Sequence, residues 1–449
     1  MSWFNKDIKK KTIPRSQGIG VIHPIYPETA VLCTKPDSIS SQQLAIATLK
    51  KFAPLRDLDE QCINSLAYTT QVFAKESILF IKGQKSEQIY YLVKGSVDIH
   101  PDSENHYQLS ADETRAHLPL NSGKNYGATA TAKTKVTLLV ISGELNQLWA
   151  QKSNDEVSCI ELIDIHLPEE INDQGFFNSF IQAYRENKLS LPSLPHVAFK
   201  LKEAIANEIG VSEAVEIIAI DPPIVTKLIQ IANSPLYAPV NPITNCHEAV
   251  TRLGLDATRN LVMSIGLKQL FKSKDKQLMK GMQNLWQKSL HLSCLSFVLA
   301  SETQTINPED ALLAGLVCDI GTIPLIHFAE QNPHDHPQFA ELEIAIPYFK
   351  APIGSLVLHT LGFSEEITAI PHHAEDWFYD SGDTLTLTDI IILAKLHSYI
   401  STKNTSDLPY INSIPAYSKL NDGKLDPDFS LQVLHKAQKR INKAMALFA

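Results

Sequence analysis

A thiol and a carboxylate stand side by side in an otherwise apolar stretch, LLAGLVCDIGTIPLI (residues 312–326), as Cys318 and Asp319. Thiolate, carboxylate and imidazole groups are common zinc ligands, so both could bind a metal together with His291 from another helix. Simpler interpretations stay open, because Cys318 can be a small buried side chain and His291 can belong to the core. A redox or nucleophilic role for Cys318 would need a lowered pKa, which only a lysine brought close by the fold could cause.

A second group of residues suggests protein contact. The loop NSPLYAPVNPITN (residues 233–245) carries Leu236, Tyr237 and Val240 among three prolines. Proline lowers the entropic cost of ordering a loop, and tyrosine is a frequent interface anchor. The three apolar residues are therefore partner-binding candidates. The alternative is that their side chains pack back onto the core and brace it.

The composition is typical of a globular protein with more than one domain. The chain has 449 residues, of which 44% are hydrophobic and 20% charged, and its formal net charge is −9. That length exceeds one compact core, and the negative charge predicts no general attraction to nucleic acid. We expect no membrane span, no signal peptide and a cytoplasmic location. The six cysteines are widely spaced, which predicts neither a zinc ribbon nor a disulfide framework.

The hydrophobic pattern changes from helical to alternating and back to helical. Asp59 is placed to cap a short helix. The stretches SILFIKGQKSEQIYYLVKGSVDIH and ATATAKTKVTLLVIS then read as strands, with Gly83 and Gly95 at turns. After Phe176 the pattern is helical, and Asp221-Pro222 and Asn307-Pro308 are typical helix starts. We predict an irregular arm (1–40), a β-roll (41–150), a linker (151–175), an all-helical domain (176–402) and a C-terminal extension with a terminal helix (403–449).

Residues 52–142 resemble the cyclic-nucleotide-binding domain family, through FAPLRDLDEQCINSLA, ILFIKGQKSEQIYYLVKGSVDI and ATATAKTKVTLLVIS. The resemblance implies a multidomain α+β protein whose β-roll grips a cyclic phosphate with an arginine and backbone N–H groups. Tyr126 stands where that arginine belongs, Gly127 follows it, and no Gly-Glu pair precedes it. The β-roll would then serve packing or protein contact. The alternative is a rewired anion site that uses Arg115 or Lys124.

Residues 176–402 resemble the HDOD family, the non-catalytic relatives of HD-domain phosphohydrolases. The resemblance is carried by LPSLPHVAFKL, IDPPIVTKLIQIANSPLYAPVNPITNCHEAVTRLGLDATRNLV, LWQKSL, LLAGLVCDIGTIPLI and LGFSEEITAIPHHAEDW. It implies an all-helical domain. His372 and His373 match a histidine pair that is often seen in the family.

The resemblance also implies which metal ligands this chain has lost. An HD enzyme holds its metal with a histidine, a His-Asp pair and a late aspartate, and the metal activates a bound water. The matching positions here are Lys288, Cys318, Asp319 and Lys395, with an auxiliary position near Lys350. An ammonium group has no lone pair to donate and repels a cation. We therefore predict no metal, no cofactor and no catalysis, and we expect the ammonium groups of Lys288 and Lys395 to replace the cation beside Asp319.

Together the resemblances imply a bacterial signal-transduction adaptor that acts through protein partners. A pathway of the cyclic-dinucleotide or two-component type is implied by the family alone. Two alternatives belong to other classes of protein. One is a metal-dependent HD-type phosphohydrolase with unusual ligands, and the other is a receptor that binds a cyclic nucleotide or another anion in the β-roll.

Overall fold

The structure is a computed structural model that describes residues 33–40, 44–101, 106–143, 145, 148–149, 175–186, 188–237, 239–332, 339–400, 407–420 and 441–446. Most of the expected arm, the expected linker except Gly175, much of the C-terminal extension and Cys159 lie outside these residues. The proposed domain boundaries stay predictions. The five cysteines that the structure describes form no disulfide bond with one another.

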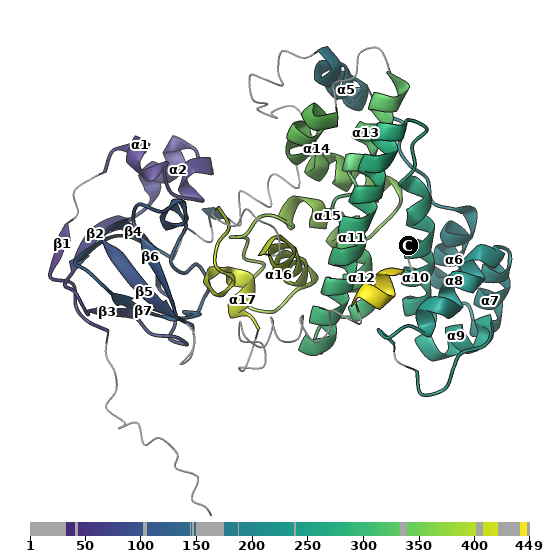
Figure 1. Ribbon diagram of the computed structural model, residues 1–449, viewed down its shortest axis with the longest axis horizontal. Helices are drawn as coiled ribbons and strands as arrows, with labels where there is room; N and C mark the ends of the chain where they lie inside the picture. Colours follow the sequence, from purple (N-terminus) through teal and green to yellow (C-terminus); the bar gives the residue numbers. More distant parts are fainter. Residues whose placement is uncertain are drawn as a thin grey trace, which may run out of the picture.

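The N-terminal part of the described chain, up to Ser142, folds into two four-stranded antiparallel sheets, seen in blue and purple in Figure 1. The strands of the first sheet, in order across it, are β1 (Ser38–Ser40), β2 (Tyr68–Phe73), β8 (Val136–Ser142) and β4 (Gln88–Lys94). Those of the second sheet are β3 (Ile78–Phe80), β7 (Thr129–Ala132), β5 (Ser96–His100) and β6 (Tyr107–Ser110). The predicted β-roll is confirmed.

Alternating apolar side chains explain why these segments form strands and where they pack. One core lies between the two sheets, and a second lies between the first sheet and the helices α1 (Ile46–Leu49) and α2 (Glu60–Ser65). Gly95 has a φ of 90° and lies so close to Lys135 that a Cβ would come within 2.5 Å of its carbonyl oxygen, so this turn requires glycine. The Asp59 carboxylate accepts a 2.8 Å hydrogen bond from the Cys62 N–H, as the predicted cap requires.

The rest of the described chain is helical, which confirms the predicted α+β fold. The helices are α5 (Gly175–Arg185), α6 (His196–Ala206), α7 (Val211–Ala219), α8 (Pro222–Ala232), α9 (Cys246–Leu253), α10 (Leu255–Leu267), α11 (Lys276–Thr303), α12 (Pro308–Val317), α13 (Thr322–Gln331), α14 (Phe339–Thr360), α15 (Glu365–His373), α16 (Leu387–Ile400) and α17 (Pro415–Ser418). Asp221 and Asn307 cap α8 and α12 through their side chains, as predicted. The long helix α11 packs along α12 and α16 at the centre of this domain.

One stretch bears on the expectation that the chain has no membrane span. Pro308–Gln331 has the length and composition of a membrane span, but 83% of its most apolar window is buried inside the helical domain. The apolar character of α12 and α13 is explained by their place in the core. This single buried stretch is weak evidence for a span.

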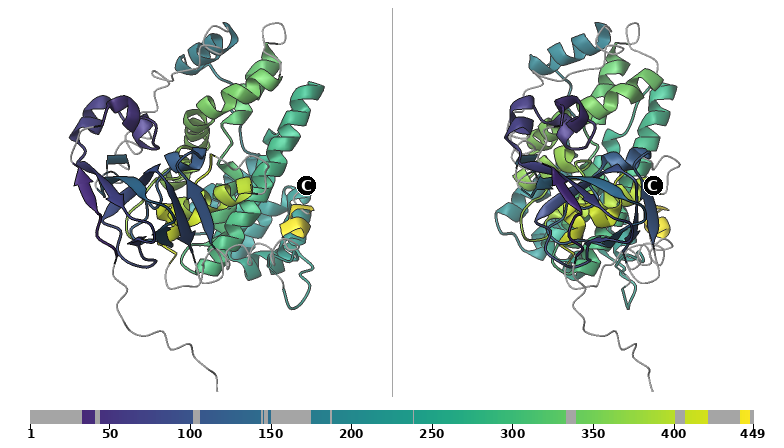
Figure 2. Two further views of the ribbon diagram at one scale, coloured as in Figure 1. Left: turned by 60° about the vertical axis from the view of Figure 1, so that its left-hand side comes forward. Right: turned by 90° about the vertical axis from the view of Figure 1, so that its left-hand side faces the viewer.

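The segment of residues 407–420 lies between the two domains. It contains a short 3-10 helix, η5 (Ile411–Ser413), and α17, and it is drawn in yellow-green beside the sheets (Figures 1 and 2). A small apolar cluster of Ala53, Leu118 and Phe378 also joins the two domains. The sheets and the helices therefore meet through the end of the helical domain.

Candidate functional site

The helical domain encloses a cavity of about 580 Å³ where the lost metal site was expected. Asp319, in the turn between α12 and α13, lines it together with Lys288 and His291 of α11, Lys350 of α14 and Lys395 of α16. The turn packs tightly against α14, because a Cβ on Gly321 would lie 2.0 Å from the Lys350 carbonyl oxygen. The fold thus brings residues from four separate stretches to one place.

Two lysines and two carboxylates fill one side of this cavity as a cluster of ion pairs. Lys395 pairs with Asp319, and its Nζ lies 3.3 Å from an oxygen of Glu375. Lys350 pairs with Glu375, and its Nζ lies 3.4 Å from the other oxygen of Asp319. The Tyr399 hydroxyl donates a 2.6 Å hydrogen bond to Glu375. The Lys395 side chain is only 5% exposed, so the cluster is largely removed from water.

The charges in this cluster support one another. Burial on its own would raise the pKa of the Asp319 carboxyl, but Lys395 and Lys350 outweigh burial and hold that pKa well below its usual range. The same balance lowers the pKa of Glu375. Burial would lower the pKa of Lys395, yet the carboxylate of Asp319 and the groups around it raise that pKa well above its usual value. The carboxylates are thus ionised and Lys395 is protonated at neutral pH.

These residues do not fit a divalent metal. Ammonium groups occupy both oxygens of Asp319, and an ammonium cannot act as a ligand. Burial, and after it the neighbouring Asp319, raises the pKa of the Cys318 thiol to about 12, so the free thiol is protonated at neutral pH and a zinc ion would have to displace its proton. In the described ranges, no group of three or more His, Cys, Asp or Glu side chains is placed to hold a metal ion. The alternative zinc site of His291, Cys318 and Asp319 is therefore not assembled.

The β-roll has its own filled site, at the position where a phosphate-binding arginine was expected. The Tyr126 ring is 7% exposed and stacks on Phe80 with ring centroids 4.4 Å apart, and Tyr90 lies 5.7 Å from Phe80. An apolar aromatic stack therefore takes the place of a cationic side chain. This arrangement offers no positive charge to a phosphate at Tyr126.

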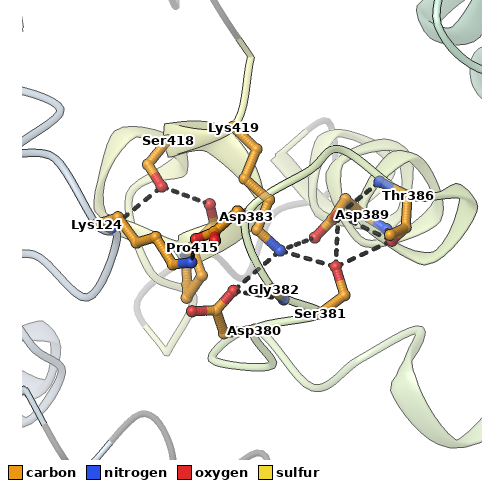
Figure 3. A network of polar contacts seen from close by, with 10 residues as sticks. All are labelled: Lys124, Asp380, Ser381, Gly382, Asp383, Thr386, Asp389, Pro415, Ser418 and Lys419. Carbon is orange, nitrogen blue, oxygen red and sulfur yellow. Dashed lines mark hydrogen bonds and ion pairs between the residues drawn. The ribbon is translucent and has the colours of Figure 1, made fainter.

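The two cations considered for a rewired anion site already have partners in the helical domain. Arg115 donates from Nε to the Leu408 carbonyl at 3.0 Å. Lys124 forms an ion pair with Asp383, in the connection between α15 and α16 (Figure 3). Both cations therefore contact residues that lie outside the β-roll.

Comparison with known proteins supports the two resemblances. The HDOD domain model matches residues 191–374, and the cyclic nucleotide-binding domain model matches residues 70–152. Residues 191–374 form an HDOD domain. The family expected for the helical half is thus confirmed, as is the cyclic-nucleotide-binding family for the β-roll.

Solved structures and a curated relative match parts of the chain. A candidate metal-dependent phosphohydrolase from Shewanella amazonensis SB2B has 24% sequence identity and a TM-score of 0.51, covering 61% of this chain and 97% of that one. A candidate signal transduction protein from Marinobacter aquaeolei VT8 has 20% identity and a TM-score of 0.44, covering 70% and 74%. An uncharacterized protein from Treponema pallidum (strain Nichols) is 27% identical over 135 residues, which is 30% of this chain and 26% of that protein. The chain thus matches about a quarter of that relative's length, and the Shewanella likeness shows the fold alone.

The other predicted site residues of the HDOD domain fall into three places. The expectation that Lys288 pairs with Asp319 was wrong, because Lys350 forms the second ion pair and Lys288 is exposed at the cavity. His291 lines the cavity and has a pKa lowered by burial. Cys318 is buried, with its sulfur 3.9 Å from the Lys395 Nζ. His372 and His373 are not among the described residues that line the cavity. Their pKa values are lowered to about 4, mainly by burial, and His373 stacks on Tyr379 with centroids 3.8 Å apart.

Glu375 is the functional residue that the sequence did not single out. It lies two residues after His373 in LGFSEEITAIPHHAEDW, a stretch that carries the family resemblance. Lys350 was predicted only as an auxiliary position of the expected metal site. The sequence pattern does not indicate this role of Glu375. Glu375 and Lys395 are 20 positions apart on different elements, and they meet only through the packing of α15 against α16.

The loop at residues 233–245 corrects part of the prediction of a partner-binding surface. Leu236 is only 6% exposed, so it cannot anchor a partner without leaving the core. The Tyr237 ring packs edge-on against Phe297 of α11 with centroids 5.5 Å apart. Val240 is 90% exposed. Leu236 and Tyr237 pack inward and brace the loop, while Val240 is exposed to solvent.

Proposed function

We propose that the protein is a non-catalytic bacterial signal-transduction adaptor that acts through protein contacts of its HDOD domain, in the cytoplasm. The observation that carries this proposal is the placement of two ammonium groups, from Lys395 and Lys350, on the Asp319 carboxylate. Asp319 occupies the one position that keeps the residue type used by HD enzymes. A dication entering the cavity would have to displace both ammonium groups and would meet their positive charge.

The ion-pair cluster supplies what a metal would otherwise supply to the fold. Asp319 follows α12, Lys350 belongs to α14, Glu375 follows α15, and Lys395 belongs to α16. Four segments are therefore held in register without a metal. A domain that keeps its shape but not its metal ligands is suited to presenting a surface to other proteins.

Metal analysis combined with a gain-of-ligand variant tests the proposal. We expect the purified protein to contain no stoichiometric transition metal and to hydrolyse neither cyclic di-GMP nor nucleotides. The triple variant Lys288→His, Lys395→Asp, Cys318→His restores the side chains expected of an HD enzyme and should acquire a metal that the wild type lacks. One equivalent of zinc or iron in the wild type, lost in Asp319→Ala, would overturn the proposal.

We propose Val240 as the exposed contact point of the loop at residues 233–245, with Leu236 and Tyr237 as its braces. The change Val240→Asp should leave the melting temperature within about a degree of wild type, as for most surface substitutions, and should abolish binding of a partner identified with the wild-type chain. Tyr237→Ala is the matched comparison and should lower the melting temperature by several degrees, because a partly buried ring that packs on Phe297 is lost. If Tyr237→Ala instead lost the partner without destabilising the protein, Tyr237 itself would be the anchor.

A further inference from the structure

The face of the β-roll between Tyr107 and Gly127 holds a peptide, and that peptide is part of the same chain. The Tyr107 ring stacks on the Tyr410 ring with centroids 3.7 Å apart. The Arg115 guanidinium lies 4.2 Å from the centre of the Tyr410 ring, while its Nε donates to the Leu408 carbonyl. An aromatic side chain and the backbone two residues before it are thus held by the same arginine.

Farther along the segment, the backbone of the peptide is gripped by donors of the β-roll. Both the N–H and the hydroxyl of Ser122 donate to the Ser413 carbonyl, at 2.7 and 2.6 Å. The Tyr107 hydroxyl donates to the Asn412 side chain at 3.2 Å, and the Lys124 N–H donates to the Ser418 hydroxyl at 3.2 Å. Ser122 and Ser413 are each 2% exposed, so these hydrogen bonds are shielded from water.

Gly127 makes the close approach of the peptide possible. A Cβ on this glycine would lie 2.0 Å from the Asn412 carbonyl oxygen, and a backbone atom cannot give way as the end of a flexible side chain can. Glycine is used where another backbone must come near. Gly127 follows Tyr126, which stands where the phosphate-binding arginine was expected. Its lack of a side chain leaves room for a peptide carbonyl oxygen.

The opposite side of the segment is anchored in the HDOD domain. Ile414 is fully buried in the helical core. The Lys419 ammonium lies 3.0 Å from both Asp380 and Asp389 and 2.8 Å from the Ser381 hydroxyl, and Figure 3 shows this network beside Ser418 and Lys124. Asp389 lies in the first turn of α16, the helix that carries Lys395. The segment is thus held firmly by the HDOD domain and offered to the β-roll.

We propose that the β-roll is a peptide-binding module whose ligand is residues 408–418 of its own chain. Its ligand class is a peptide with an aromatic side chain at the start of a short 3-10 turn and, three residues later, a carbonyl held by two donors. This assignment goes beyond the adaptor proposal, because it holds whether or not the HDOD domain is catalytic. Because the segment is anchored in the HDOD domain, its binding to the β-roll depends on where the end of that domain lies.

Amide exchange in the full-length protein tests the contact. The N–H groups of Ser122 and Lys124 donate to the peptide, so they exchange when it is released. Tyr410→Ala removes the stack and the cation–π contact and should speed their exchange by about tenfold. Gly127→Ala should do at least as much. Tyr410→Phe keeps the ring and should behave like wild type.

Matched controls separate peptide release from general damage. Tyr348→Ala removes an exposed tyrosine of α14, and Gly175→Ala adds a Cβ that meets nothing within 4 Å. Neither should change the exchange of Ser122 and Lys124. The amide of Leu138, in the buried strand β8, should keep its protection in every variant and so reports that the β-roll is still folded.

A synthetic peptide distinguishes a binding site from a passive contact. A fluorescent peptide with the sequence of residues 407–413 should bind the full-length Tyr410→Ala protein, whose own segment leaves the site more often than in wild type. It should bind wild type much less, because the tethered copy competes at high effective concentration, and Gly127→Ala not at all. Unchanged exchange in both Tyr410→Ala and Gly127→Ala would overturn the proposal, as would equal peptide binding by these two variants.

Discussion

The HDOD cavity and the β-roll site each lack ligand-binding residues that the family resemblances led us to expect, and different side chains stand in their place. In the HDOD cavity a charged centre is kept, because Lys395 and Lys350 replace a cation beside Asp319. In the β-roll the charge is removed, because the Tyr126 ring stacks on Phe80 where an arginine was expected. The first solution preserves the electrostatics of the old site and leaves a cavity. The second replaces electrostatics with apolar packing.

The difference follows from what each fold needs at that place. Asp319 is 14% exposed, so an unpaired carboxylate there would be costly, and a positive group must remain near it. The β-roll keeps no buried carboxylate at Tyr126 to be neutralised, so an aromatic ring can fill the space and contribute to the core between the sheets. Four tests would break or sharpen this contrast.

Removing the replacement cation should have the largest effect. Lys395→Ala leaves Asp319 and Glu375 with one ammonium group between them, and breaking such a buried pair typically costs about 3–5 kcal/mol. We expect a loss of that size in the free energy of unfolding, measured by denaturant titration. Lys288→Ala is the control, because this exposed lysine lines the same cavity and should change stability by less than about 0.5 kcal/mol. Equal effects would show that the ion pairs are not what the cavity depends on.

Removing the replacement ring should cost slightly less. Tyr126→Ala opens a void against Phe80, and we expect a loss of about 3 kcal/mol, near the lower end for a buried aromatic. Tyr126→Phe keeps the ring and should stay close to wild type. The amide exchange of Leu138 in β8 measures the stability of the β-roll separately from the HDOD domain. A large effect of Tyr126→Phe would mean that the hydroxyl matters, contrary to a purely apolar filling.

Acid should destabilise the protein through buried histidines of the HDOD domain. Burial lowers the pKa of His372, His373 and His397 to about 4, against about 6.5 in an unfolded chain. Between these values the unfolded state binds more protons, so stability falls as the pH falls from about 6.5 toward 4. One such histidine, for example His373, which is 2% exposed, contributes a loss of about 2 kcal/mol by pH 5. His373→Phe should flatten the decline in melting temperature between pH 8 and pH 5, and an unchanged slope would exclude this residue as a cause.

Cyclic nucleotides should have the smallest effect, namely none. A ligand at a hundred times its dissociation constant would stabilise the protein by about 2.7 kcal/mol. Because Tyr126 is stacked and Arg115 is held by Leu408 and Tyr410, we expect neither cyclic AMP nor cyclic GMP to raise the melting temperature. A clear rise would mean that the β-roll still receives a nucleotide, and the contrast between the two sites would fail.

The sequence by itself determined the elements and the loss of the ligands. The change of period from two to 3.6 predicted sheets followed by helices, and side-chain caps such as Asp59 and Asn307 act within three residues, so they are legible in a linear string. The absence of an arginine at Tyr126 and of histidine at Lys288 and Cys318 could likewise be seen without a structure. These features depend on local residue type and spacing.

What replaced the lost ligands was decided by the tertiary structure. Glu375 joins Lys395 and Lys350 only because α14, α15 and α16 pack together, and no spacing rule relates these positions. The segment around Tyr410 meets Tyr107 across about 300 residues, which periodicity and motif spacing cannot register. The apolar loop residues Leu236 and Tyr237 also needed the fold to show that they face inward. Long-range contacts depend on how all elements pack at once, and this physical reason separates what the sequence predicts from what only the folded chain shows.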